Sequence, residues 1–147
     1  MEDVPYCHER CEMRYTEDDY VRIGSWSKAV LEWDCHARYI LYLGICLVCP
    51  ERHYYVGKTK QVIRSRFDQY QCQIRKGRKN QTDSLVKHFV AKHPKLEPNR
   101  QTLAVAQVSG AYADEDDLYW AEKDLISETG NALKKINRYH CLMNQRC

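Results

Sequence analysis

The chain has 147 residues, of which 44% are hydrophobic and 29% charged, and a formal net charge of +3 at pH 7. These values fit one globular domain with a sizeable core. The longest apolar run, residues 39–50, is far too short to span a bilayer, and the amino end lacks a secretory apolar region. We therefore expect an intracellular protein of the nucleus or cytoplasm, not secreted and without a membrane partner, whose thiols stay reduced.

The first 37 residues differ from the rest of the chain. Residues 1–15 are polar, and residues 16–37 are predicted to form a helix around Trp26, Val30, Leu31 and Trp33. We therefore divide the chain into an N-terminal extension with one helix, residues 1–37, and a main domain, residues 38–147.

Residues 39–48 and 53–57 are rich in β-branched and aromatic side chains and flank the turn Cys-Pro-Glu-Arg, which predicts a β-hairpin. Gly57 is predicted to end the second strand, where its missing Cβ would let a ligand approach the backbone.

Residues 60–77 are predicted to be helical, because Ile63, Phe67, Tyr70 and Ile74 recur at the spacing of one helix face. Further elements are a helix at 83–92, a strand at 102–108 and a helix at 116–128. This order predicts an α+β fold, in which a small mixed or antiparallel sheet of three strands, the hairpin plus one, is flanked by helices.

Positive charge gathers on the first helix of the main domain and the loop after it. Between residues 58 and 79 there are eight Lys or Arg and a single acid, Asp68. Such a segment would neutralise several DNA phosphates, although it could equally be a solvated helix face. The predicted nucleic-acid-binding residues are Lys58, Lys60, Arg64, Arg75, Lys76, Arg78 and Lys79.

The segment 55–59, Tyr-Val-Gly-Lys-Thr, followed by Arg66 and Tyr70, resembles the second motif of the GIY-YIG nucleases. For the first motif we align Tyr42 with the family's tyrosine, and the rival register is the literal string Gly44-Ile45-Cys46. Tyr42 is preferred because its spacing to the cysteines that follow resembles GIY-YIG domains of Penelope-like mobile elements. The lysine at 58 and the tyrosine at 70 resemble the excision-repair members.

Two later segments extend the resemblance over residues 38–139. Residues 118–126 look like the family's metal-binding helix, with Glu122 as its carboxylate, and Ile136-Asn137 looks like its closing motif. The resemblance implies an endonuclease that hydrolyses DNA phosphodiester bonds and depends on one divalent ion, Mg²⁺ or Mn²⁺, held by Glu122. The implied catalytic residues are Tyr42, Tyr55, Lys58, Arg66, Tyr70, Glu122 and Asn137.

The resemblance also implies roles for these residues. Arg66 would bind the scissile phosphate. Tyr55 or Tyr42, with a phenol pKa lowered by nearby cations, would take the proton from the attacking water. Lys58 would contribute to the cationic field, Tyr70 would complete the phenol network, and Asn137 would orient a neighbour.

Cysteines and histidines form a separate pattern. Cys46, Cys49, His88 and His93 have the ligand types of a structural zinc site, and Cys7-His8 with Cys11 is another short group. The first set requires two elements separated by 38 residues to converge. Strand cysteines are often small buried hydrophobes, and the sequence favours that interpretation over zinc.

Two other functions stay open. The degenerate first motif fits a catalytically inactive nucleic-acid-binding domain derived from such a nuclease. A cysteine-rich protein-interaction module that docks a partner through Trp26 and Trp33 is the third alternative. A domain this small has little room for specificity modules, so we expect either a targeting protein partner or a cut directed by DNA structure.

Overall fold

The computed structural model of the protein describes residues 35–77 and 83–144. The helix expected at residues 16–37 lies almost wholly outside these ranges, and its described residues, 35–37, are not helical, with a turn at 35 and 36. The group Cys7, His8 and Cys11, both extension tryptophans and the cations Arg78 and Lys79 also lie outside the described residues.

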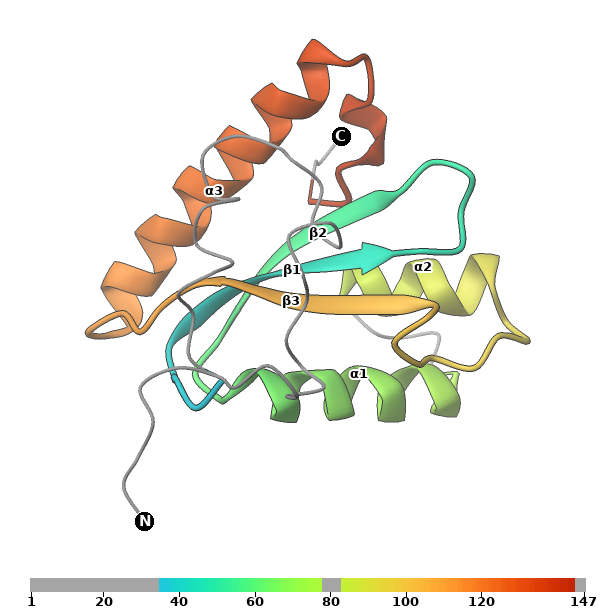
Figure 1. The fold of residues 1–147 in the computed structure, drawn as a ribbon, viewed down its shortest axis with the longest axis horizontal. Helices are drawn as coiled ribbons and strands as arrows, with labels where there is room; N and C mark the ends of the chain where they lie inside the picture. The colour runs from blue at the N-terminus through green and yellow to red at the C-terminus, as the bar shows by residue number, and fades with distance from the viewer. Residues whose placement is uncertain (1–34, 78–82, 145–147) are drawn as a thin grey trace.

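The sheet has three strands, β1 (Ile40–Cys46), β2 (His53–Thr59) and β3 (Leu103–Ser109), in the order β2-β1-β3. Both pairs are antiparallel, and every residue of the central strand β1 is buried (Figure 1). The predicted α+β fold with a hairpin and a third strand is thereby confirmed in its antiparallel form. The prediction that Gly57 ends the second strand is wrong, because β2 continues to Thr59 and Gly57 pairs with Tyr42 inside the ladder.

Helices cover both faces of the sheet (Figure 1). Successive side chains of a strand point to opposite faces, so both sets are buried. On one face lie α1 (Ile63–Lys76) and α2 (Ser84–Lys92). On the other lie α3 (Glu115–Lys135) and the short 3₁₀ helix η3 (Tyr139–Cys141). Each large apolar side chain that is fully buried in these two layers contributes roughly 1.5–3 kcal/mol relative to exposure.

The helix boundaries follow local signals. The predicted face of α1 is confirmed, since Ile63, Phe67, Tyr70 and Ile74 are its buried residues. Helix α3 begins at the N-cap Asp114 with three acids in its first turn, where carboxylates favour the helix N-terminus.

Helix α3 ends seven residues later than the predicted 128, because Thr129, Gly130 and Leu133 are buried and packing outweighs the low helix propensity of glycine. Among the described residues, no helix is both long and apolar enough to cross a membrane.

Candidate active site

The hairpin register places the first predicted tyrosine against the glycine of the second motif. Tyr42 and Gly57 are paired residues of β1 and β2, and the ring of Tyr42 lies over the glycine so closely that a Cβ at residue 57 would overlap it. The glycine is therefore needed for an aromatic ring of the chain itself rather than for the approach of a ligand. Cys46, the tyrosine position of the rival register, pairs with His53 at the other end of the hairpin.

Arg66 of α1 is the centre of a polar network on this face of the sheet. Its guanidinium donates to the hydroxyl of Tyr42 (2.9 Å), the hydroxyl of Tyr70 (3.2 Å) and the carboxylate of Asp83 (2.9 Å). The two phenol oxygens are 2.7 Å apart, and the guanidinium carbon lies 4.2 Å from the centre of the Tyr70 ring. The expected stacking of Arg66 and Tyr70 along one helix edge thus occurs, and both contact the strand tyrosine.

Asp83 is a member of this network that the sequence analysis missed. One oxygen of its carboxylate accepts from Arg66 and from the Tyr70 hydroxyl (2.9 Å), and the other accepts from the backbone N–H of Leu85 (2.9 Å) and Val86 (3.3 Å). It is therefore the N-cap of α2 and the counter-ion of Arg66 at once. An aspartate directly before an apolar helix is a cap signal, but only the tertiary structure reveals its second role.

Tyrosine pKa values in this region are raised, so the prediction that nearby cations lower them is wrong for the protein without substrate. Burial is the main cause for Tyr42, for which Arg66 opposes the shift, and it is also the main cause for Tyr70. The pKa of Tyr55 is likewise raised, first by burial and then by the charges of Asp83, Tyr42 and Glu122. All three phenols are therefore protonated at neutral pH.

Tyr55 packs against the layer of α1 and α2, on the same face of the sheet as the Arg66 network. Its pKa responds to both Asp83 and Glu122, so the two carboxylates act on the same phenol from different elements. Its side chain is half-buried, and within the described part of the chain its hydroxyl makes no hydrogen bond. The edge strand β2 thus carries two candidate residues, Tyr55 and Lys58, that interact with candidates on α1 and α3.

Glu122 projects from α3 toward Lys58, the residue that follows Gly57 in the second motif. The Nζ of Lys58 lies 3.1 Å from a carboxylate oxygen of Glu122, and the two side chains are 38% and 14% exposed. A partly exposed single carboxylate fits a Mg²⁺ or Mn²⁺ site, because Mg²⁺ is commonly held by one or two carboxylates while water and substrate phosphate complete its shell.

Asn137 does not lie with the other predicted catalytic residues. It is exposed, has a φ of 59° and follows the C-terminal end of α3, about 20 Å along the helix axis from Glu122. Asn144 instead binds the edge strand, accepting from the backbone N–H of Val56 (2.6 Å) and donating to its carbonyl (2.8 Å). No sequence motif marks this asparagine, because its contact with β2 joins residues that are 88 positions apart.

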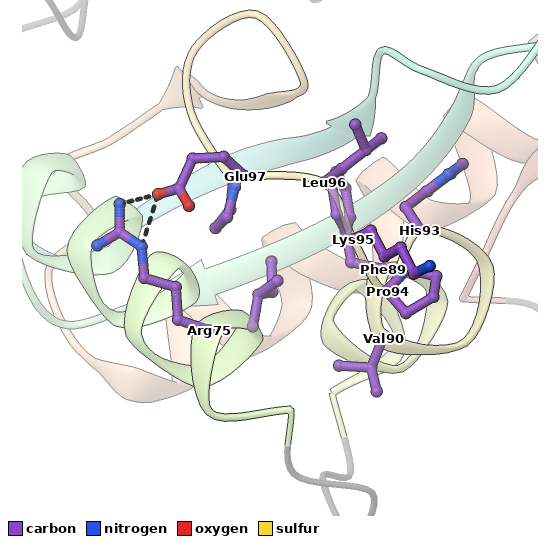
Figure 2. Close-up of a pocket in the computed structure, with 10 residues that line it drawn as sticks. Arg75, Phe89, Val90, His93, Pro94, Lys95, Leu96 and Glu97 are labelled. Atoms are coloured by element: carbon purple, nitrogen blue, oxygen red, sulfur yellow. Dashed lines mark hydrogen bonds and ion pairs between the residues drawn. The ribbon is translucent and has the colours of Figure 1, made fainter.

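Several of the predicted DNA-binding cations are paired within the protein. Lys60 pairs with Glu115, Arg64 with Asp68 at 3.3 Å, and Arg75 with Glu97, while Lys76 is exposed in the last turn of α1. Figure 2 shows the Arg75–Glu97 pair at a pocket between the C-terminal ends of α1 and α2. None of the predicted catalytic residues lines this pocket, so the chemistry lies elsewhere.

Two exposed aromatic residues next to Glu122 were also missed. Tyr119 and Trp120 are 41% and 65% exposed, and the ammonium groups of Lys58 and Lys123 each lie 5.2 Å from the centre of the Tyr119 ring. Aromatic faces beside lysines form a surface suited to nucleobases and phosphates. Their signal in the sequence is the Tyr-Trp pair at positions 119 and 120, just before Glu122, in a segment whose pattern predicts only a helix.

The structure brings Cys46, Cys49, His88 and His93 together at the far end of the hairpin from Tyr42. Their ligand atoms all lie within 4.8 Å of one another, so the two distant elements do converge. Burial lowers the pKa of His88 to about 4 and raises that of the Cys49 thiol to about 11.

Comparison with known protein families matches residues 38–137 to the GIY-YIG catalytic domain. The match covers more than half of the chain, so the protein belongs to the GIY-YIG family and carries a nuclease-type domain, whose substrates are nucleic acids. Comparison with curated proteins and with solved structures gives no match.

Proposed function

We propose that the protein is a divalent-metal-dependent endonuclease that hydrolyses DNA phosphodiester bonds. The observation that carries this proposal is the Arg66 network, in which two phenols and a carboxylate orient one guanidinium beside strand β2. The same strand bears Lys58, whose ammonium group pairs with Glu122 of α3. A fixed guanidinium, the phenol of Tyr55 without a hydrogen bond to residues 35–77 and 83–144, and a partly exposed carboxylate are groups suited to phosphodiester hydrolysis.

Arg66 binds the scissile phosphate in this proposal. Its planar donor fork suits two phosphate oxygens, and the side chain keeps 18% exposure through which a phosphate can approach. Tyr42 and Tyr70 are positioning residues, because their hydroxyls contact Arg66 and each other. Asp83 offsets the buried positive charge.

Tyr55 takes the proton from the attacking water. A general base must reach water, and the half-buried Tyr55, with its hydroxyl unpaired among the described residues, meets this condition. Tyr42 does not, since it is 1% exposed and its hydroxyl is bonded to protein groups. The raised pKa would make the Tyr55 phenolate a strong base, and a cation held by Glu122 would supply positive charge that favours this phenolate.

Glu122 would hold the divalent ion, and Lys58, its present partner, would then be free to contact the phosphate. Such an ion, when bound, offsets the negative charge that develops on the leaving oxygen. DNA lies over the surface that Lys58, Lys123, Tyr119 and Trp120 share, where aromatic faces can stack on bases and lysines can neutralise phosphates. Its specificity for a sequence or structure would then come from this surface or from a targeting protein partner.

Cleavage of supercoiled plasmid in Mg²⁺ by the Glu122→Ala variant tests the proposal. We expect DNA binding to persist while cleavage falls by at least ~10²–10⁴-fold, the range typical of losing a general base. Asp124→Ala is the matched control, because this exposed acid of the same helix should be dispensable. Undiminished cutting by Glu122→Ala would reject the assignment of the metal ligand.

A catalytically inactive nucleic-acid-binding domain is the second candidate, and one observation favours it. Arg66 already has Tyr42, Tyr70, Asp83 and Gln69 as hydrogen-bond partners, so a phosphate would have to compete with groups of the protein. This alternative predicts salt-sensitive DNA binding by the wild-type protein without cleavage in Mg²⁺ or Mn²⁺. The plasmid assay therefore separates the two functions.

A further inference from the structure

Four metal-binding side chains from two separate parts of the chain meet at one end of the sheet. Cys46 is the last residue of β1, and Cys49 lies in the turn before β2. His88 is on α2, and His93 is the residue that caps this helix. Both cysteines are free thiols, and each residue offers one ligand atom to a common centre.

The distances between these atoms match the edges of a coordination tetrahedron. The two sulfurs are 3.7 Å apart, and sulfur-to-Nε2 distances are 3.4 Å for Cys46–His93, 3.3 Å for Cys49–His88 and 3.3 Å for Cys49–His93. Zinc bonds of about 2.3 Å to sulfur and 2.0–2.1 Å to nitrogen require edges of about 3.8 Å and about 3.6 Å. Hydrogen bonding explains the arrangement less well, because the single Nε2 of His93 lies near both sulfurs.

We infer that Cys46, Cys49, His88 and His93 bind one zinc ion in a closed site that stabilises the fold and positions α2. Two thiolates with two imidazoles are a ligand set that zinc prefers, and four protein ligands leave no open position for a substrate. The site is thus structural, and it is separate from the divalent-ion site at Glu122 on α3.

The zinc site also bears on the Arg66 network, because both lie at the ends of the same short helix. Helix α2 has nine residues, from Ser84 to Lys92, so it is a rod of about 13 Å. Zinc would fix its C-terminal end to the β1–β2 turn, and this would hold its N-cap, Asp83, against Arg66 and Tyr70. Asp83 is therefore a positioning residue, and its contacts with Arg66 and Tyr70 depend on the zinc ion. Any effect of zinc on DNA cleavage rests on the proposed nuclease function.

Metal analysis tests the zinc site without reference to nuclease activity. Wild-type protein purified without added zinc should contain one zinc per chain at this site, and Cys49→Ser should lose it. Cys72→Ser, which removes an exposed thiol of α1, is the matched control and should keep the zinc. The double variant Cys7→Ser/Cys11→Ser tests whether the N-terminal group Cys7, His8 and Cys11 binds the zinc instead. Zinc that is lost only in this double variant would overturn the inference. A wild-type protein without zinc would overturn it as well.

X-ray absorption at the zinc edge keeps the test decisive if Cys49→Ser does not fold. The wild-type spectrum should fit two sulfurs at about 2.3 Å and two nitrogens at about 2.0–2.1 Å. A shell of four sulfurs, or one of only oxygen and nitrogen, would overturn the assignment.

The positioning of Asp83 is tested through the Arg66 Nε–H resonance in NMR, since this group donates to Tyr42. Removing zinc with a chelator, under conditions where circular dichroism still reports a folded protein, should shift or broaden that resonance, and adding zinc should restore it. An unchanged resonance would refute the coupling. A wild-type protein that binds zinc but cuts no DNA would instead refute only the nuclease proposal.

Discussion

The two ends of α2 lie on the same face of the sheet yet carry different chemistry. At the N-terminal end, Asp83 joins a network of phenols and a guanidinium that keeps some exposure. Toward the C-terminal end, His88 at the middle of the helix and His93 at its C-cap face two thiols. The apolar side chains of the helix are buried between them. The proposed nuclease site and the proposed zinc site thus lie at opposite ends of one short helix, which we call the reactive end and the stabilising end, and substitutions at the two ends should have different consequences.

Tyr55→Phe is expected to give the largest effect at the reactive end. Removing a general base should lower the cleavage rate by about 10²–10⁴-fold, with little change in stability because the ring remains. Single-turnover cleavage of labelled DNA, together with a thermal melt, measures both. Tyr42→Phe should act differently, through loss of a hydrogen bond to Arg66 and a lower melting temperature. If only Tyr42→Phe abolished cleavage, the roles of the two phenols would be reversed.

The pH profile of the wild type sharpens the same assignment. A phenol whose pKa is raised is protonated at neutral pH, so the fraction of reactive phenolate grows as pH rises. The cleavage rate should therefore increase by about tenfold per pH unit through the neutral range until the pKa in the complex is reached. Residual cleavage by Tyr55→Phe should lack this slope. A rate that falls with increasing pH would argue against a phenol base.

Asp83→Asn is expected to give the next largest effect, and it acts at the reactive end through stability. The amide oxygen can still cap α2, but the positive charge of the mostly buried Arg66 would lose its counter-ion. We expect a loss of about 2–3 kcal/mol, less than the ~3–5 kcal/mol of a fully buried pair because Arg66 keeps some exposure and its hydrogen bonds to Tyr42 and Gln69.

Denaturant unfolding measures this loss, and Asp68→Asn is its control. Asp68 pairs with Arg64 on the surface of α1, and both side chains are more than half exposed, so its substitution should cost at most about 0.5 kcal/mol. Equal losses in the two variants would mean that the Arg66 network contributes no more than a surface pair.

The secondary structure and much of the Arg66 network could be predicted from the sequence, because hydrophobic periodicity and motif spacing are local signals. The spacing of four residues between Arg66 and Tyr70 placed them on one helix edge, and the hairpin brought Tyr42 to them. Asp83 could be recognised as a helix cap, but the direction of its second carboxylate oxygen depends on how α2 packs on α1.

Two other differences have similar physical causes. The motif Ile136-Asn137 predicts a role for Asn137 from local sequence alone, whereas its exposed place beyond the end of α3 depends on how that helix packs. The long gap in the cysteine and histidine pattern argues against zinc in the sequence, and only the packing of α2 along β1 closes that gap.

Gly57→Ala is expected to give the smallest effect, and it tests whether Tyr42 needs the glycine of the second motif. The new methyl group would overlap the Tyr42 ring, so the ring must move and its hydroxyl would leave Arg66 and Tyr70. Overpacking of this kind costs about 1–3 kcal/mol, which denaturant unfolding can measure. The same substitution in a Tyr42→Leu background should cost much less, because the shorter side chain leaves room for the methyl group. Equal costs in both backgrounds would contradict the contact and would return Gly57 to the role of a site for close approach of a ligand.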